Sequence, residues 1–220
     1  RIVPNARKME EVTYDEMLEM ASLGAKVLHS RCVEIAKKYG VELLVCSSLN
    51  RNSGTMVREK TKMEKMLISG VAADKNVAKI RVAGLGNDPE STFRLLNLLD
   101  RNNLNIDVMI QSLGKDGTKS VSFTVAKPDM LRTIDVLNDN KDSLGIKKLD
   151  YDENVAKISV IGAGVRSHSG VAAKMFGALA NAGINTEMIT TSEIRITALI
   201  DEAYADQAMR AIHETFLERV

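Results

Sequence analysis

Two glycine-rich segments carry the residues whose types and spacing could do chemistry. The first is Gly84–Pro89 (GLGNDP) and the second is Gly162–Gly170 (GAGVRSHSG). Neither has the G-x-G-x-x-G spacing of a dinucleotide-binding fingerprint, which argues against a nicotinamide site. A loop that leads into a helix N-terminus exposes backbone N–H groups and favours a carboxylate. We therefore expect an anion-binding rather than a redox site.

A free amino acid would bring an ammonium group as well as a carboxylate to such a loop. Asn87, Asp88 and Glu90 could accept hydrogen bonds from that ammonium. The alternative is that these residues only cap the helix that follows. The residues by themselves favour the capping interpretation and leave the amino-acid site as the alternative.

The other reactive side chains give weaker signals. His168 has no evident Ser or Cys partner, so we expect a solvated loop histidine rather than a catalytic base. His29 and His213 fall in helical patterns and are expected to be structural. Cys32 and Cys46 have neither zinc-ligand spacing nor a disulfide framework, which predicts reduced thiols and no metal site.

A duplicated module positions the two loops. Val77–Gly86 (VAKIRVAGLG) recurs as Val155–Gly164 (VAKISVIGAG), and Asn105-Ile106 recurs as Asn185-Thr186. Each copy predicts a strand, a glycine-rich loop, a helix and a second strand. The first copy continues through a hairpin turn, a strand, a helix and a closing strand, at residues 114–117, 120–126, 128–138 and 146–151. This β-α-β-β-α-β order predicts an α+β, ferredoxin-like fold in tandem.

The second copy has no room for its closing strand. Its predicted strands are 156–161, 186–191 and 194–200, and a helix over 202–216 leaves too few residues for another. An open sheet edge would remain unpaired. We expect the short strand Met66–Ala72, which precedes the first copy, to complete the sheet of the second.

The segment upstream of the repeats predicts two helices and a strand. Thr13 or Asp15 can cap the first helix, which Gly24 interrupts. The second helix should run over 26–39, end at Gly40 and be followed by a strand over 41–47. Its expected inward positions are Val27, Leu28, Val33, Ile35 and Ala36.

The repeats resemble the two ACT domains of aspartokinases. The resemblance rests, in chain order, on IRVAGLGNDPE, NIDVMIQS and DGTKSVSFTV, then SVIGAGVRSHSGVAAKMF and INTEMITTSEIRITALI. The text upstream, from RIVPNARKMEEV to VELLVCSSL, resembles the final part of the amino-acid kinase domain of the same family. The implied domains are a kinase remnant over 1–60, a first ACT domain over 61–152 and a second over 153–220.

The resemblance implies an allosteric region that binds an end-product amino acid. Lysine is expected in preference to threonine, and the controlled reaction is phosphorylation of L-aspartate by ATP, the entry to lysine, threonine and methionine synthesis. Neither loop matches the family pattern Asp-x-Pro-Gly fully, which leaves the effector open. The implied effector-binding residues are Asn87, Asp88, Glu90, Ser91, Thr92, Asn105, Ile106, Asp107, Gln111, Ser167, His168, Ser169, Gly170, Val171, Ser192 and Glu193.

Little of the catalytic machinery is implied. Arg1 matches the arginine of an Asp-Pro-Arg motif near the nucleotide, and Lys26 matches a lysine close to it. The family's Lys-x-Gly-Gly-Thr-Ser segment and any P-loop are missing from this sequence. We therefore expect no cofactor and no activity in this chain alone, with ATP and Mg²⁺ serving the parent enzyme. The expected partners are that enzyme's catalytic lobe and a second copy, paired through the ACT domains. Two alternatives stay open, an assembly module that binds no effector and a small enzyme in its own right.

Composition excludes several classes of protein. The chain is 45% hydrophobic with a net charge of +1, which predicts a globular protein without an electrostatic case for nucleic acid. Aromatic residues make up 4% with no Trp, which disfavours base stacking. No apolar run approaches the ~20 residues of a membrane span, and no signal peptide opens the sequence. A cytoplasmic location is expected, and the initial Arg1 suggests a fragment of a longer protein.

Overall fold

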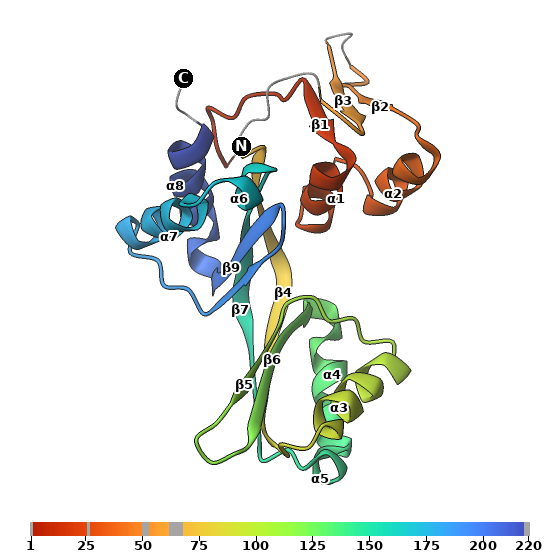
Figure 1. Cartoon of the computed structure of the whole chain (residues 1–220), viewed down its shortest axis with the longest axis vertical. Helices are drawn as coiled ribbons and strands as arrows, with labels where there is room; N and C mark the ends of the chain where they lie inside the picture. Colours follow the sequence, from red (N-terminus) through yellow and green to blue (C-terminus); the bar gives the residue numbers. More distant parts are fainter. Residues whose placement is uncertain (1, 26, 50–52, 62–67, 218–220) are drawn as a thin grey trace. The chain divides into compact units, whose positions relative to one another are not determined.

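The chain forms two compact units, shown in Figure 1. The computed structural model describes residues 2–25, 27–49, 53–61 and 68–217. Residues 76–156 form one unit, here called the first-repeat unit. Residues 1–75 and 157–220 form the other, here called the second-repeat unit. Strands β4 (Gly70–Leu85) and β7 (Lys148–Ile161) are long enough to contribute to both.

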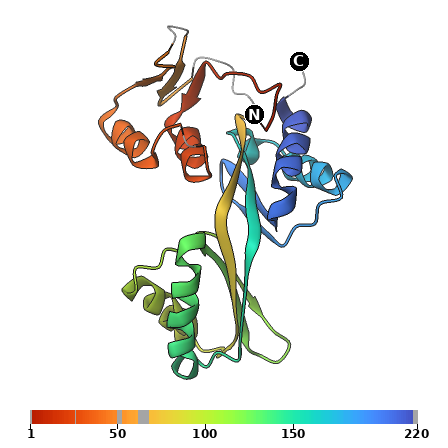
Figure 2. The same cartoon turned by 180° about the vertical axis from the view of Figure 1, so that it is seen from behind.

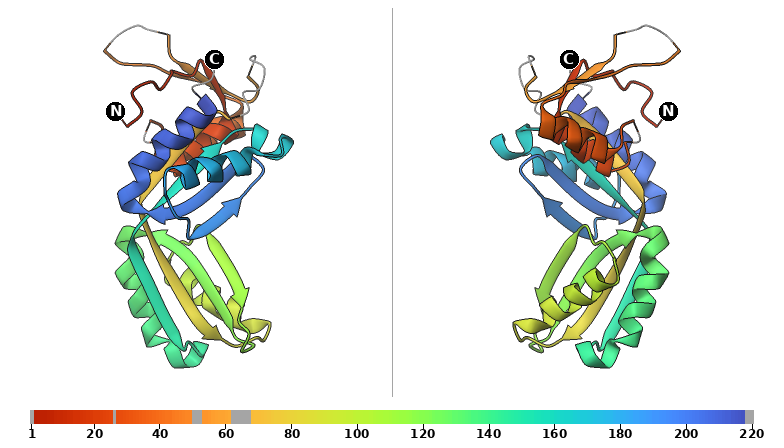
Figure 3. Two further views of the ribbon diagram at one scale, coloured as in Figure 1. Left: turned by 90° about the vertical axis from the view of Figure 1, so that its left-hand side faces the viewer. Right: turned by 90° about the vertical axis from the view of Figure 1, so that its right-hand side faces the viewer.

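The first-repeat unit has the predicted β-α-β-β-α-β order. Between its parts of β4 and β7 lie α3 (Glu90–Arg101), β5 (Met109–Leu113), β6 (Lys119–Ala126), the short η1 (Lys127–Asp129), α4 (Met130–Asp139) and α5 (Lys141–Leu144). The strands are arranged β5-β6-β4-β7, and β6 is antiparallel to both of its neighbours. Figure 3 shows α3 and α4 packed beside these strands. The ferredoxin-like prediction is confirmed.

Alternation along the strands explains this core. Ile80 and Val82 of β4 and Phe123 of β6 are fully buried, and Leu95 and Leu99 of α3 cover them. The predicted hairpin turn joins β5 to β6 at residues 114–117, where the Gly117 N–H donates to the Gly114 carbonyl oxygen and Gly117 has φ +75°.

The second-repeat unit repeats the arrangement with one borrowed strand. Its elements are α6 (Gly164–Ser167), α7 (Val171–Asn181), β8 (Met188–Thr191), β9 (Arg195–Asp201), η2 (Glu202–Tyr204) and α8 (Ala205–Leu217). The strand order is β4-β7-β9-β8, so the early part of β4 takes the place of a closing strand. The Ser69 N–H donates to the Ile161 carbonyl oxygen at 2.8 Å. Of the expected strand Met66–Ala72, residues 66 and 67 lie outside the described residues and residues 70–72 lie in β4.

Two expected breaks are wrong. The predicted strands over 66–72 and 146–151 end before the repeat strands begin, which leaves breaks at residues 73–76 and 152–155. The structure instead shows β4 and β7 as continuous strands of 16 and 14 residues. Each strand lies beside the other, so the ladder can continue through residues that would favour a turn in isolation.

The upstream segment belongs to the second-repeat unit. It contains β1 (Glu11–Thr13), α1 (Tyr14–Ser22), α2 (Ser30–Tyr39), β2 (Leu43–Val45) and β3 (Thr55–Arg58), with the strands in the order β1-β3-β2. The sequence missed β1 and β3, which are too short to show alternation. Helix α2 starts at Ser30 rather than at Lys26, because the His29 ring caps it by accepting a hydrogen bond from the Arg31 N–H. Two of the expected inward residues, Val27 and Ile35, are exposed.

A capping box starts helix α1 at Thr13. Thr13 caps it, and its hydroxyl oxygen accepts from the Glu16 N–H while the Glu16 carboxylate accepts from the Thr13 N–H. Asp15, the alternative cap, instead pairs with Lys37 of α2 and raises the pKa of that lysine. After the helix, Gly24 has φ +101°, and a Cβ there would lie 2.4 Å from the Ala73 carbonyl oxygen. Figure 2 shows α1 beside β4, away from α7 and α8.

No helix in the described ranges is both long and apolar enough to cross a membrane.

Candidate functional site

Asp88 organises the loop of the first-repeat unit. Its carboxylate accepts from the Glu90 N–H at 3.0 Å and from the Ser91 hydroxyl, and Arg94 lies 3.5 Å away. The hydrogen bond from Ser91 is the main cause that holds the Asp88 pKa below its ordinary value, so the group stays charged. Asp88 therefore fixes the start of α3, and an arriving ammonium would meet a carboxylate that already has donors.

Two cations near this loop were not singled out from the sequence. Lys119, the first residue of β6, donates from Nζ to the Asp88 carbonyl oxygen at 2.8 Å, and Arg94 follows one turn into α3. Gly86 is needed here, since a Cβ would lie 2.6 Å from Asp88 Oδ2. The only available signal for Lys119 was its place after the hairpin turn, which pattern reading cannot connect to residue 88.

The predicted residues of α3 and β5 are joined directly. The Thr92 hydroxyl donates to Gln111 Oε1 at 2.6 Å, which links the helix to the edge strand. Asn87, Glu90, Asn105 and Asp107 are all exposed, and Ile106 is half-buried. Asp107 is anchored by its backbone, because its N–H donates to the Thr124 carbonyl oxygen at 3.1 Å.

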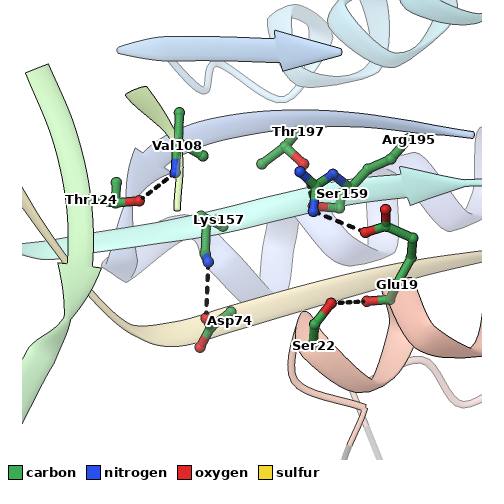
Figure 4. A network of polar contacts seen from close by, with 9 residues as sticks. All are labelled: Glu19, Ser22, Asp74, Val108, Thr124, Lys157, Ser159, Arg195 and Thr197. Atoms are coloured by element: carbon green, nitrogen blue, oxygen red, sulfur yellow. Dashed lines mark hydrogen bonds and ion pairs between the residues drawn. The ribbon is translucent and has the colours of Figure 1, made fainter. Parts of the chain in front are cut away.

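The Thr124 side chain adds a second anchor beside Asp107. Its hydroxyl oxygen accepts from the Val108 N–H at 3.1 Å, as Figure 4 shows. Thr124 is fully buried, so this segment has a fixed backbone beneath exposed polar side chains. Such a segment can present Asp107 to a ligand without a large ordering cost.

In the second-repeat unit, the loop at 167–171 is an exposed turn before α7. His168 is exposed, as expected of a solvated loop histidine, although Ser167 Oγ lies 2.9 Å from its Nδ1 and so is a partner that the sequence did not suggest. The search for a catalytic partner did not consider the residue directly before the histidine. Ser169 and Gly170 are also exposed, Gly170 has φ +102°, and Val171 is buried as the first residue of α7.

The turn at Ser192-Glu193 is tied to that loop. Glu193 lies 3.1 Å from Arg166 of α6, and both side chains are mostly exposed. The Ser192 N–H donates to the Arg195 carbonyl oxygen at 2.7 Å, and the Gly162 N–H donates to the Ile194 carbonyl oxygen at 2.9 Å. Arg166 is a further residue that the sequence analysis missed, although it stands inside the second glycine-rich segment.

Glu187 is the second-repeat counterpart of Asp107. The Glu187 N–H donates to the Leu199 carbonyl oxygen at 2.8 Å, as the Asp107 N–H does to that of Thr124. The repeat register that aligns Asn105 with Asn185 already pairs these two carboxylates, so the signal was present in the sequence. The two units thus each offer a carboxylate at the same point of the repeat.

Each unit by itself offers groups that suit recognition of a small zwitterion. These are hydroxyl groups, carboxylates and cations on exposed loops. In the described ranges no group of three or more His, Cys, Asp or Glu side chains could hold a metal ion. Arg1 and Lys26, the nucleotide-binding remnant that the resemblance implies, lie outside the described residues.

Comparison with known proteins shows which families this chain resembles. The ACT domain family matches residues 158–216, and the amino acid kinase family matches residues 1–47. An aspartokinase of Pseudomonas aeruginosa is 41% identical over 219 residues, which are 98% of this chain and 53% of that protein. The chain spans about half the length of the curated relatives it matches.

Two solved structures match the chain to different extents. The ligand-free regulatory subunit of aspartate kinase from Thermus thermophilus is 33% identical with a TM-score of 0.65, over 68% of this chain and 99% of that one. E. coli aspartokinase III in complex with lysine and aspartate is 25% identical with a TM-score of 0.79, over 99% of this chain and 48% of that one. Since the chain covers one such subunit almost completely at 33% identity, and the amino acid kinase match precedes the ACT match in the sequence, the chain belongs to the aspartokinase family.

Proposed function

We propose that this chain regulates an aspartokinase by binding an end-product amino acid at its ACT domains, with lysine preferred to threonine. The observation that carries the proposal is the match to 99% of a solved aspartate kinase regulatory subunit. The repeats supply the loop chemistry that an amino acid needs, namely helix-start amides for its carboxylate and side-chain oxygens for its ammonium.

Lysine is preferred because of the carboxylates at the site. Its second ammonium needs an acidic partner, and Asp107 and Glu193 are candidates. Glu193 already faces Arg166 at 3.1 Å, so a lysine ammonium there would share the carboxylate with that guanidinium. The E. coli relative solved with lysine supports the same effector class. Threonine has no second ammonium and would leave Asp107 unused.

The regulated reaction is the transfer of phosphate from ATP to L-aspartate, giving 4-phospho-L-aspartate. We assign this chemistry, with ATP and Mg²⁺, to the catalytic lobe of the parent enzyme, because the phosphate-binding motif is not in this sequence. The chain would act in the cytoplasm as a homodimer paired through its ACT domains.

Thermal unfolding tests effector binding on the 220-residue chain. A ligand that binds only the native state stabilises it by about 2.7 kcal/mol at a hundred times its Kd, which raises the unfolding midpoint by several degrees. Lysine should produce this rise, and norleucine, which lacks the second ammonium, should not. No rise with lysine or threonine would overturn the proposal.

The assembly module remains the second candidate function, favoured by one observation. Every residue of the edge strand β5 is exposed, including Met109, Ile110 and Leu113. An exposed apolar edge strand is a template for pairing with another chain. A dimer that forms without any heat of amino-acid binding would support this candidate instead.

A further inference from the structure

Helix α1 of the amino-acid-kinase segment is attached to the second repeat through two acidic side chains. Glu16 and Glu19 are three residues apart and share one face of the helix. The Glu16 carboxylate accepts a hydrogen bond from the Ser69 hydroxyl, and Ser69 in turn donates its N–H to Ile161 at the end of β7. Glu19 accepts from Arg195 of β9 at 2.9 Å, as Figure 4 shows.

The Glu19–Arg195 pair is partly shielded from solvent. The two side chains are 25% and 19% exposed. Arg195 Nε is buried and has no hydrogen-bond partner in the part of the chain that the structure describes. Such a guanidinium depends on Glu19 for its charge compensation, unlike a solvated surface pair. A small movement of Arg195 would therefore weaken its ion pair with Glu19 of α1.

The backbone of Arg195 belongs to the turn that carries two candidate effector residues. Its carbonyl oxygen accepts from the Ser192 N–H, which closes the turn around Glu193. The next residue back, Ile194, accepts from Gly162 at the start of the second glycine-rich segment. A ligand held by Ser192 or Glu193 would restrain this turn and with it the direction of the Arg195 side chain.

We propose that the Glu19–Arg195 ion pair is a coupling contact, through which occupancy of the turn at residues 192–194 changes the stability of α1. The inference rests on the proposed function, since it needs an amino acid bound at that turn. Glu16 and Ser69 provide a second, fixed attachment, so Arg195 acts as a positioning residue rather than as the whole interface. Coupling of this kind requires that the ligand contact one element while both elements share a contact that can be weakened.

Hydrogen exchange of the 220-residue chain, with and without saturating lysine, tests the coupling. In the wild type, exchange of the α1 amides should slow by about threefold or more when lysine is present. Arg195→Gln and Glu19→Gln should each abolish this response while calorimetry still detects lysine binding. Lys75→Gln is the matched control, because Lys75 pairs with Asp206 of α8 at 2.8 Å and should leave the α1 response intact.

The possible outcomes distinguish a failure of the coupling role from a failure of the proposed effector binding. An unchanged α1 response in both variants would overturn the coupling role and leave effector binding standing. Lysine binding without any α1 response in the wild type would do the same. No binding of lysine or threonine to the wild type would remove the proposed function and the coupling together. If one variant loses the slow exchange of its α8 amides and therefore does not fold, the other variant still decides.

Discussion

Asp107 and Glu187 allow the two repeats to be tested against each other at the level of single residues. The backbone N–H of each residue makes the equivalent hydrogen bond in its own repeat, but the family resemblance implies only Asp107 as an effector contact. A charged hydrogen bond is worth about 1.5–3 kcal/mol. Asp107→Ala should therefore weaken lysine binding roughly ten- to a hundredfold, at ~1.4 kcal/mol per decade. Calorimetric titration measures the change.

The controls for Asp107 are built into the chain. Threonine affinity should change little in Asp107→Ala, because threonine has no second ammonium to lose a partner. Glu187→Ala should leave lysine affinity nearly unchanged. If the loss of affinity appears in Glu187→Ala instead, the second repeat supplies the carboxylate, and unchanged affinity in Asp107→Ala removes Asp107 from the site.

Asp88 gives a prediction about pH. Its pKa is held below the ordinary value chiefly by Ser91, so its capping contribution is present above the unfolded value and is lost as pH falls through the folded pKa. The carboxyl NMR shifts of Asp88 should titrate with a pKa below the ordinary aspartate value of 3.8. Ser91→Ala should move the midpoint back toward 3.8, whereas the exposed Ser169→Ala should not. An unshifted midpoint in Ser91→Ala would show that the hydroxyl has no such role.

At the scale of elements, the helices and strands with a clear local pattern of buried residues could be predicted from the sequence. The strands β6 and β9 and the helix α8 have strong alternating or helical patterns and were predicted within a few residues. The breaks expected at 73–76 and 152–155 were wrong because pairing between β4 and β7 is a tertiary effect that no local signal carries. Arg166, Lys119 and Arg195 were missed for the same reason, since each meets a partner that is not recognisable from its neighbours in sequence, and Arg195 meets Glu19, which is 176 residues away.

A buried hydroxyl pair holds β7 to β9 and can be tested by a double substitution. Ser159 and Thr197 are 0% and 2% exposed, and their side-chain oxygens lie 2.7 Å apart. Ser159→Ala should lower the free energy of unfolding by about 1–3 kcal/mol, because the Thr197 hydroxyl is left buried without its partner. Adding Thr197→Val removes the stranded group and should recover most of the loss. Denaturant unfolding measures both, and additive losses in the double variant would contradict the hydroxyl pair as the cause.

At the scale of the whole molecule, the exposed edge of β5 predicts self-association. All five residues of β5 are exposed, and Leu113 is 63% exposed. The outer backbone groups of an edge strand are unpaired within the sheet, and a two-fold dimer would satisfy the same groups on both copies at once. Sedimentation of the 220-residue chain should show a mass that rises from monomer to dimer with concentration.

A charge placed on the β5 edge should break that dimer while the fold persists. Ile110→Lys or Leu113→Lys puts a cation where an apolar side chain would be covered, and each should weaken association about tenfold or more, at ~1.4 kcal/mol per decade. Leu131→Lys on α4 is the matched control, because Leu131 is 67% exposed but does not lie on the strand edge. Equal weakening by all three variants would point to a general effect of charge, and a chain that stays monomeric at every concentration would remove β5 as an interface. If the lysine heat disappears together with the dimer, the effector site needs both copies, whereas retained heat places the binding determinants within one chain.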